Sequence, residues 1–173
     1  MKNAAISTAI VAVVATVGDW VWASFLSRHR MVAGLMHGAL LCLAMGAVLA
    51  LPARRVVTGA VWGMGVGIAA AAAFYALAPV LRYGAMLPAW FALWVLLALV
   101  QRRITTTAVS WREAGVRGAI AGTASAVAFY LVSGMWTGWN PRDINYLDHL
   151  ARWTFAFAPG FIALQAPAPA RRI

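Results

Sequence analysis

The sequence predicts an all-α fold, a polytopic membrane bundle of six transmembrane helices. Of its 173 residues, 64% are hydrophobic and 10% are charged, whereas a soluble domain carries about 25% charged residues. The apolar residues form runs of about 20, the length that crosses a bilayer as a helix. These runs lack the period-two alternation of strands. They also leave no room for a separate soluble domain, so we expect a single domain over residues 1–173.

Six apolar segments are long enough to be transmembrane helices. They cover residues 5–26, 31–51, 56–81, 84–100, 116–136 and 146–165, and the tail 166–173 is expected to be disordered. The first segment also resembles a cleaved signal peptide, because Lys2 precedes it and Val13 and Ala15 have the spacing of a cleavage site. The apolar run continues to Leu26, which favours a retained helix; cleavage would leave five spans.

Small residues recur at every fourth position in three of the segments. Such residues lie on one face of a helix and let two backbones approach closely. They are Gly34, Gly38, Cys42 and Gly46 in the second segment, Gly59, Gly63, Gly67 and Ala71 in the third, and Gly118, Gly122 and Ala126 in the fifth. We expect these three helices to form the tightly packed centre of the bundle, with Cys42 as a packing residue.

The third and fifth segments share a sequence pattern. GMGVGIAAAAAFY (63–75) aligns without a gap with GAIAGTASAVAFY (118–130). Both helices would cross the membrane in the same direction, which predicts a parallel repeat of helix hairpins. Ala/Gly-rich composition explains the similarity equally well.

Two further features concern helix ends and breaks. Ser110 and Glu113 precede the fifth apolar run with the spacing of a capping box, in which each side chain binds the other residue's backbone N–H. Pro159 and Gly160 lie well inside the sixth segment, and Pro88 lies near the outer end of the fourth. Such residues break helices near the binding sites of many transporters. They are also frequent in ordinary membrane helices.

Lys and Arg predict the orientation, because the cytoplasmic loops of membrane proteins are enriched in them. With six spans, the two termini and the second and fourth loops share one side. That side carries Lys2, Arg54, Arg55, Arg102, Arg103, Arg112, Arg117, Arg171 and Arg172. The other side carries Arg28, Arg30, Arg82 and Arg142. We therefore expect a multi-pass protein of the cell inner (plasma) membrane with both termini in the cytoplasm.

The positions of the tryptophans and of the basic residues agree with this six-span topology. Trp62 and Trp111 are expected at the inner interface; at the outer one we expect Trp20, Trp22, Trp90, Trp136, Trp139 and Trp153. The net charge of +10 comes from Lys and Arg in short loops, so the partner we expect is the lipid bilayer, and nucleic-acid binding is excluded. One cysteine permits no intramolecular disulfide.

Ionisable side chains inside a membrane mark functional sites, because their burial in hydrocarbon is costly. The candidate ligand-binding residues are Asp19, His37, Tyr75, Tyr130, His149 and Arg152. At about 1.5 Å per residue, the first four lie roughly 10 Å below the outer boundary on four different helices. His149 and Arg152 lie slightly shallower on a fifth helix. We expect these side chains to line a pocket that opens to the outer face.

This layer favours binding or transport of a small molecule, with no cofactor and no catalytic residue. A purely structural network is one alternative, in which Asp19 pairs with His37 or Arg152 and Asp148 pairs with Arg152. A second is a haem- or metal-dependent redox protein that uses His37 and His149. A third is an accessory subunit without a ligand, whose small-residue faces pack on a partner helix or a second copy of the chain.

Overall fold

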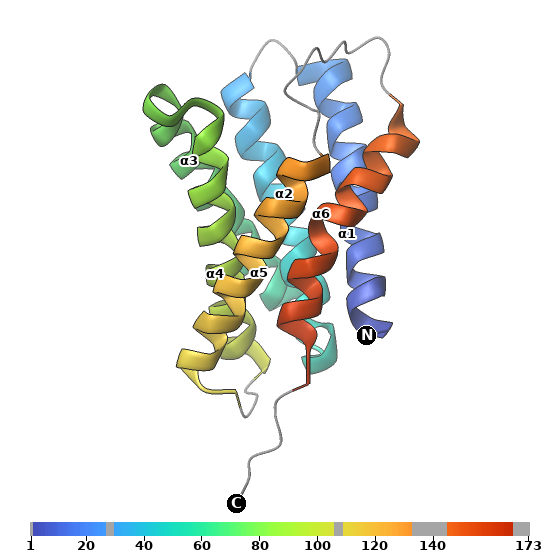
Figure 1. The fold of residues 1–173 in the computed structure, drawn as a ribbon. Helices are drawn as coiled ribbons and strands as arrows, with labels where there is room; N and C mark the ends of the chain where they lie inside the picture. Colours follow the sequence, from blue (N-terminus) through green and yellow to red (C-terminus); the bar gives the residue numbers. More distant parts are fainter. Residues whose placement is uncertain (1, 27–29, 106–108, 133–144, 168–173) are drawn as a thin grey trace, which may run out of the picture.

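The computed structural model describes residues 2–26, 30–105, 109–132 and 145–167, and within these ranges it is helical with no strand (Figure 1). The α-helices are α1 (Lys2–Val21), α2 (Arg30–Ala50), α3 (Val56–Leu81), α4 (Met86–Thr105), α5 (Trp111–Val132) and α6 (Tyr146–Gln165). Shorter turns are the π-helix Trp22–Leu26 and the 3-10 helices Leu51–Ala53 and Arg82–Ala85. The predicted all-α class is confirmed.

The helix boundaries follow the predicted segments, and the differences are largest for α1, α4 and α5. α4 continues to Thr105, beyond the predicted end at residue 100. α5 begins at Trp111 because the Ser110 hydroxyl oxygen accepts a hydrogen bond from the backbone N–H of Glu113 (3.1 Å). The other half of the predicted capping box is wrong, since the Glu113 carboxylate accepts from Arg117 instead (2.8 Å). Residues 133–136 of the fifth predicted segment and residues 168–173 of the predicted tail 166–173 lie outside the described residues.

The predicted break in the sixth segment does not occur. α6 is one helix that continues through Pro159. Gly160 serves packing instead, because a Cβ there would overlap the ring of Trp94. Pro88 is the third residue of α4, where a backbone N–H has no acceptor within the helix and its loss costs little.

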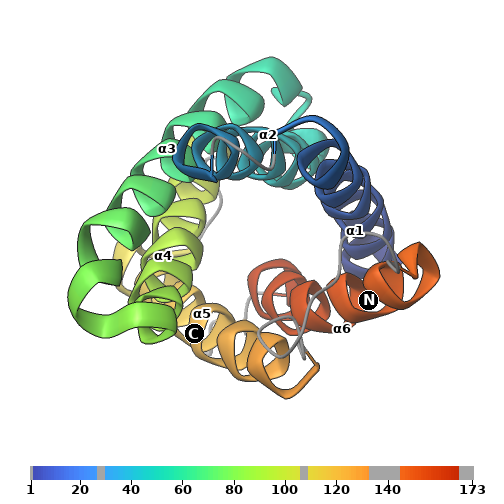
Figure 2. The ribbon, with the colours of Figure 1, turned by 90° about the horizontal axis from the view of Figure 1, so that it is seen from above.

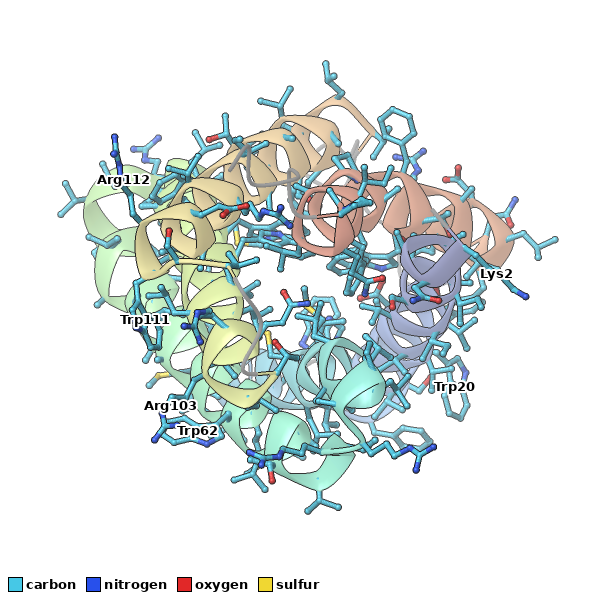
Figure 3. All side chains as sticks on the ribbon, turned by 90° about the horizontal axis from the view of Figure 1, so that it is seen from below. Lys2, Trp20, Trp62, Arg103, Trp111 and Arg112 are labelled. Atoms are coloured by element: carbon cyan, nitrogen blue, oxygen red, sulfur yellow. The ribbon has the colours of Figure 1, made fainter. Side chains whose placement is uncertain are left out.

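The helices form a closed ring in chain order. Each helix packs against the next, and α1 closes the ring by packing against α6 (Figure 2). The helices run alternately up and down, so α1 begins and α6 ends at the same end of the bundle (Figure 1). We call this the basic end. Lys2, Arg103 and Arg112 lie around its rim and point outward (Figure 3).

The small-residue faces pack as the sequence predicts, but in two separate pairs. α2 and α3 pack glycine against glycine: a Cβ on Gly63 would overlap the carbonyl oxygen of Cys42, and one on Gly67 would overlap that of Gly38. α5 packs against α4, where a Cβ on Gly118 would lie 2.7 Å from the Cα of Val95. The three faces therefore do not meet in a single centre.

These contacts give the internal repeat a structural counterpart. Gly63 and Gly118 are matched positions of the two aligned sequences, and each packs its helix against the one before it. α3 and α5 also run in the same direction (Figure 1). The hairpins α2–α3 and α4–α5 thus use the repeated glycines in the same way.

The length and composition of the helices are compatible with a membrane protein. Four described stretches are long and apolar enough to cross a membrane: Lys2–Phe25, Met31–Ala53, Val56–Thr105 and Trp111–Val132. The third contains both α3 and α4, which pack against each other. α6 is not among the four.

Tryptophans divide between the surface and the interior. Trp20, Trp62 and Trp111 lie exposed on the outside of the bundle, as an interface position requires (Figure 3). Trp90 and Trp153, which were expected at the outer interface, are only 7% and 6% exposed. That expectation is wrong for these two, because both rings pack inside the bundle. Trp136 and Trp139 lie outside the described residues.

Candidate functional site

The carboxylate of Asp19 joins α1 to α6. Its Oδ2 accepts a hydrogen bond from the indole Nε1 of Trp153 at 2.6 Å and lies 3.0 Å from the imidazole Nδ1 of His149. The side chains of His149 and Asp19 are only 10% and 14% exposed. When Asp19 is ionised, Nδ1 of His149 carries the proton, because a carboxylate only accepts. Asp19 thus fixes both the histidine and the indole ring.

The start of α6 sets this geometry. The Asn145 side chain caps the helix by accepting from the backbone N–H groups of Leu147 (3.1 Å) and Asp148 (3.3 Å). His149 therefore falls in the first turn, and Trp153 follows four residues later on the same face. Both side chains point at Asp19, just before α1 widens into the π-helical turn Trp22–Leu26.

From Trp153 on this face of α6, a row of packed aromatic rings continues into the interior of the bundle. Trp153 stacks on Phe157, one turn further along α6, with 5.3 Å between ring centroids. Trp90 of α4 stacks on Phe157 (5.5 Å) and on Phe129 of α5 (4.9 Å). The Trp90 and Trp153 rings are parallel, 2° apart in orientation, with centroids separated by 6.4 Å. Rings from three helices thus build one rigid wall.

This aromatic wall faces a chamber of about 190 Å³ between α2, α3, α4 and α6. We call it the central chamber. Trp90, Trp153 and Phe157 line one side, while His37 and Tyr75 line it from α2 and α3. Glycines at 34, 38 and 67 border it as well. A Cβ on Gly34 would overlap the hydroxyl of Tyr75, so this glycine makes room for the phenol.

His37 separates the central chamber from a second cavity. The imidazole lies 6.3 Å from the Trp153 ring and within electrostatic range of Asp19. A Cβ on Gly18 of α1 would lie 2.6 Å from its Nδ1, so the ring rests on the backbone of α1. His37 also lines a groove of about 370 Å³ between α1 and α2, whose other walls are almost wholly apolar.

Two of the predicted site residues have other contacts. The Tyr130 hydroxyl donates to the backbone carbonyl of Tyr83 (2.6 Å), which ties α5 to the turn between α3 and α4. Arg152 donates to Asp148 (2.7 Å) and to the carbonyl of Val132 at the end of α5 (2.7 Å). The structure therefore brings Asp19, His37, Tyr75 and His149 to one region, and gives Tyr130 and Arg152 helix-connecting contacts.

Trp90 and Trp153 also line the chamber, and neither was among the predicted site residues. A signal for Trp153 was present, since it follows His149 by four residues and thus shares its face. The sequence contains no comparable signal for Trp90.

The described residues contain no group of three or more His, Cys, Asp or Glu side chains that could hold a metal ion. What the chamber offers is aromatic faces, an imidazole and a phenol, which suit a small molecule held by stacking and a few hydrogen bonds. No known protein-family model matches the chain, and no curated protein or solved structure matches it either.

Proposed function

We propose that this protein is an integral membrane protein that binds or transports a small molecule through the central chamber. One observation supports this most directly: the central chamber is lined by an aromatic wall on one side and by a histidine and a tyrosine on the other. Ligand pockets have this composition, with apolar walls and a few polar groups that set orientation.

The volume of the chamber favours a particular ligand size. A cavity of about 150 Å³ holds a molecule such as benzene. The 190 Å³ of the central chamber therefore suits a molecule of about one ring that carries one or two hydrogen-bonding groups. This size favours a small aromatic or heterocyclic ligand over a haem macrocycle.

In this proposal Asp19 and His149 are positioning residues. Asp19 binds the indole N–H of Trp153, and Trp153 in turn lines the chamber. Neither Asp19 nor His149 lines the chamber itself, whereas His37 and Tyr75 do. The groups that would contact the ligand are therefore His37, Tyr75, Trp90 and Trp153.

We further propose that all six helices span the membrane, with both termini in the cytoplasm. The stretch Val56–Thr105 has 50 residues, about 75 Å as a continuous helix, against a hydrocarbon core of about 30 Å. Its two antiparallel helices are therefore two spans. α6 completes the ring between α5 and α1, and the pairing of Asp148, His149 and Arg152 lowers the cost of burying these polar groups.

Thiol labelling tests this topology. In a Cys42→Ala background, we expect a membrane-impermeant maleimide added to intact cells to label Tyr83→Cys and Leu147→Cys but not Lys2→Cys or Pro167→Cys. All four should react after the membrane is opened. Labelling of Lys2→Cys and Pro167→Cys on opposite sides of the membrane would contradict six spans.

Filling the chamber should abolish ligand binding. Ala70 is buried and lines the chamber, so we expect Ala70→Phe to remove detectable binding of indole, measured by titration calorimetry in detergent. We expect His37→Ala to weaken binding about tenfold, because it removes one hydrogen-bonding group.

Ala69→Phe is the matched control. Ala69 is the neighbouring residue of α3 and is exposed, so the same side chain there projects away from the chamber. Indole binding by this variant should equal that of the wild type. If the wild type binds no single-ring aromatic or heterocyclic probe, or if all three variants bind equally well, the proposed function is wrong.

A further inference from the structure

The apolar groove between α1 and α2, of about 370 Å³, opens to the outside of the ring. Val17 of α1 and Met36 and Leu40 of α2 line it and are 52%, 48% and 56% exposed. The described residues that line it include no Asp, Glu, Lys or Arg, and His37 is the one that can ionise. With both helices in the membrane, the groove would face lipid chains rather than water.

Two side chains separate the apolar groove from the central chamber. His37 and Leu41 line both cavities, and no other described residue does. They are four residues apart on α2 and therefore lie on one face of the helix. Leu41 is buried, whereas His37 is partly exposed. At these two positions, a single side chain separates the outside of the ring from the chamber.

The imidazole of His37 is available to a molecule in either cavity. No hydrogen bond within the described part of the chain involves this ring. A neutral imidazole carries one N–H donor and one acceptor nitrogen. Because the ring is partly exposed and lines both cavities, a ligand on either side can form a hydrogen bond with it. His37 is thus a polar group placed between the apolar groove and the aromatic wall.

The seam between α1 and α2 is less tightly closed than the seam on the other side of α2. Among neighbouring helices of the ring, α1 and α2 are the least extensively packed against each other. In contrast, α2 and α3 meet backbone to backbone, because a Cβ on Gly67 would overlap the carbonyl oxygen of Gly38. Passage between α1 and α2 therefore requires side chains to rotate but does not require two such backbones to separate.

We propose that the ligand of the central chamber enters from the bilayer through the apolar groove and passes His37. This inference rests on the proposed function and adds the class of ligand to it. A charged molecule would lose its hydration in the groove without gaining a charged partner, so the route admits uncharged, lipid-soluble molecules. A single neutral ring with one N–H or O–H group fits, because that group can bind His37 as the ring leaves the lipid.

Association rates measured in nanodiscs test this route. The bromine of 5-bromoindole quenches tryptophan fluorescence, so stopped-flow mixing follows the arrival of the probe beside Trp90 and Trp153. The double variant Val17→Phe/Met36→Phe fills the groove, and neither residue lines the chamber. We expect its association and dissociation rates to fall by the same factor, at least about tenfold, while the Kd stays within about twofold of the wild type.

The double variant Ile6→Phe/Ile68→Phe is the matched control. Both residues are exposed, 47% and 45%, and neither lines the apolar groove or the central chamber. Its association rate should equal that of the wild type. Ala70→Phe, which fills the chamber, measures the quenching caused by probe dissolved in the lipid, and this signal is subtracted.

Replacing His37 by alanine should accelerate entry although it weakens binding. The change removes the imidazole from the partition, so we expect association of 5-bromoindole to become at least about twofold faster and dissociation to accelerate more. Loss of a histidine that only supports the fold would weaken binding without faster association.

Equal association rates in the wild type, the blocked double variant and the control would overturn the route and leave the proposed function intact, since the ligand would then enter elsewhere. Loss of equilibrium binding in the blocked variant would also overturn the route, because the groove would then belong to the binding site or be needed for folding. Slower association in His37→Ala would do the same. A wild type that binds neither 5-bromoindole nor indole contradicts the proposed function and the route with it.

Discussion

Replacing Asp19 by alanine is expected to lower the free energy of unfolding by about 3 kcal/mol. Two buried groups depend on its Oδ2, the indole N–H of Trp153 (2.6 Å) and the imidazole of His149 (3.0 Å). Removing the carboxylate leaves both without their acceptor in a region that water does not reach easily. Asp19→Asn retains one acceptor oxygen, so we expect about half of this loss. Unfolding in mixed micelles with increasing dodecyl sulfate measures both.

Asp148→Ala is the matched control for Asp19. Asp148 also forms an ion pair, with Arg152 at 2.7 Å, but its side chain is 46% exposed and its partner is four residues away on the same helix. Exposed pairs of this kind contribute at most about 0.5 kcal/mol. Equal destabilisation by Asp19→Ala and Asp148→Ala would mean that the buried contacts of Asp19 do not support the fold.

Replacing Gly63 by alanine is expected to destabilise the protein by about 3 kcal/mol or to separate α2 from α3. The added Cβ would overlap the carbonyl oxygen of Cys42 and lie 3.0 Å from the Cα of Gly46. These are backbone atoms on a neighbouring helix, and they cannot rotate away as a side chain can. Leucine at this position should prevent folding.

Gly65→Ala tests the same change two residues along α3. A Cβ on Gly65 would meet nothing within 4 Å. Since alanine favours the helix over glycine, we expect the free energy of unfolding to stay the same or to rise by up to about 1 kcal/mol. If Gly63→Ala is as stable as Gly65→Ala, the close packing of α2 on α3 is wrong.

The fold was predictable because long apolar runs and small residues every fourth position are local signals. The third and sixth segments have their predicted boundaries. The Ser110 cap at the start of α5 was also predictable, and its hydroxyl accepts from the backbone N–H of Glu113 as expected. The error was the role of the Glu113 carboxylate, which binds Arg117. The predicted break at Pro159 and Gly160 was also wrong: α6 continues through Pro159, and Gly160 leaves room for the ring of Trp94.

The site was predictable only in part, because sequence position gives depth but not the rotation of a helix about its axis. Tyr75 and Tyr130 are matched residues of the repeat at similar predicted depth. Tyr75 lines the central chamber, whereas Tyr130 binds the carbonyl of Tyr83. Trp153 was not assigned to the site because its partner Asp19 is 134 residues away in sequence. Only the packing of α6 against α1 brings the two together.

Locating a bound molecule tests the central chamber most directly. Crystals of the protein grown with 5-bromoindole allow the bromine to be found from its anomalous scattering. The proposed function predicts one bromine site between His37, Tyr75, Trp90 and Trp153, and no such site in the Ala70→Phe variant. A bromine found only in the apolar groove between α1 and α2, or no ordered bromine at all, would contradict it.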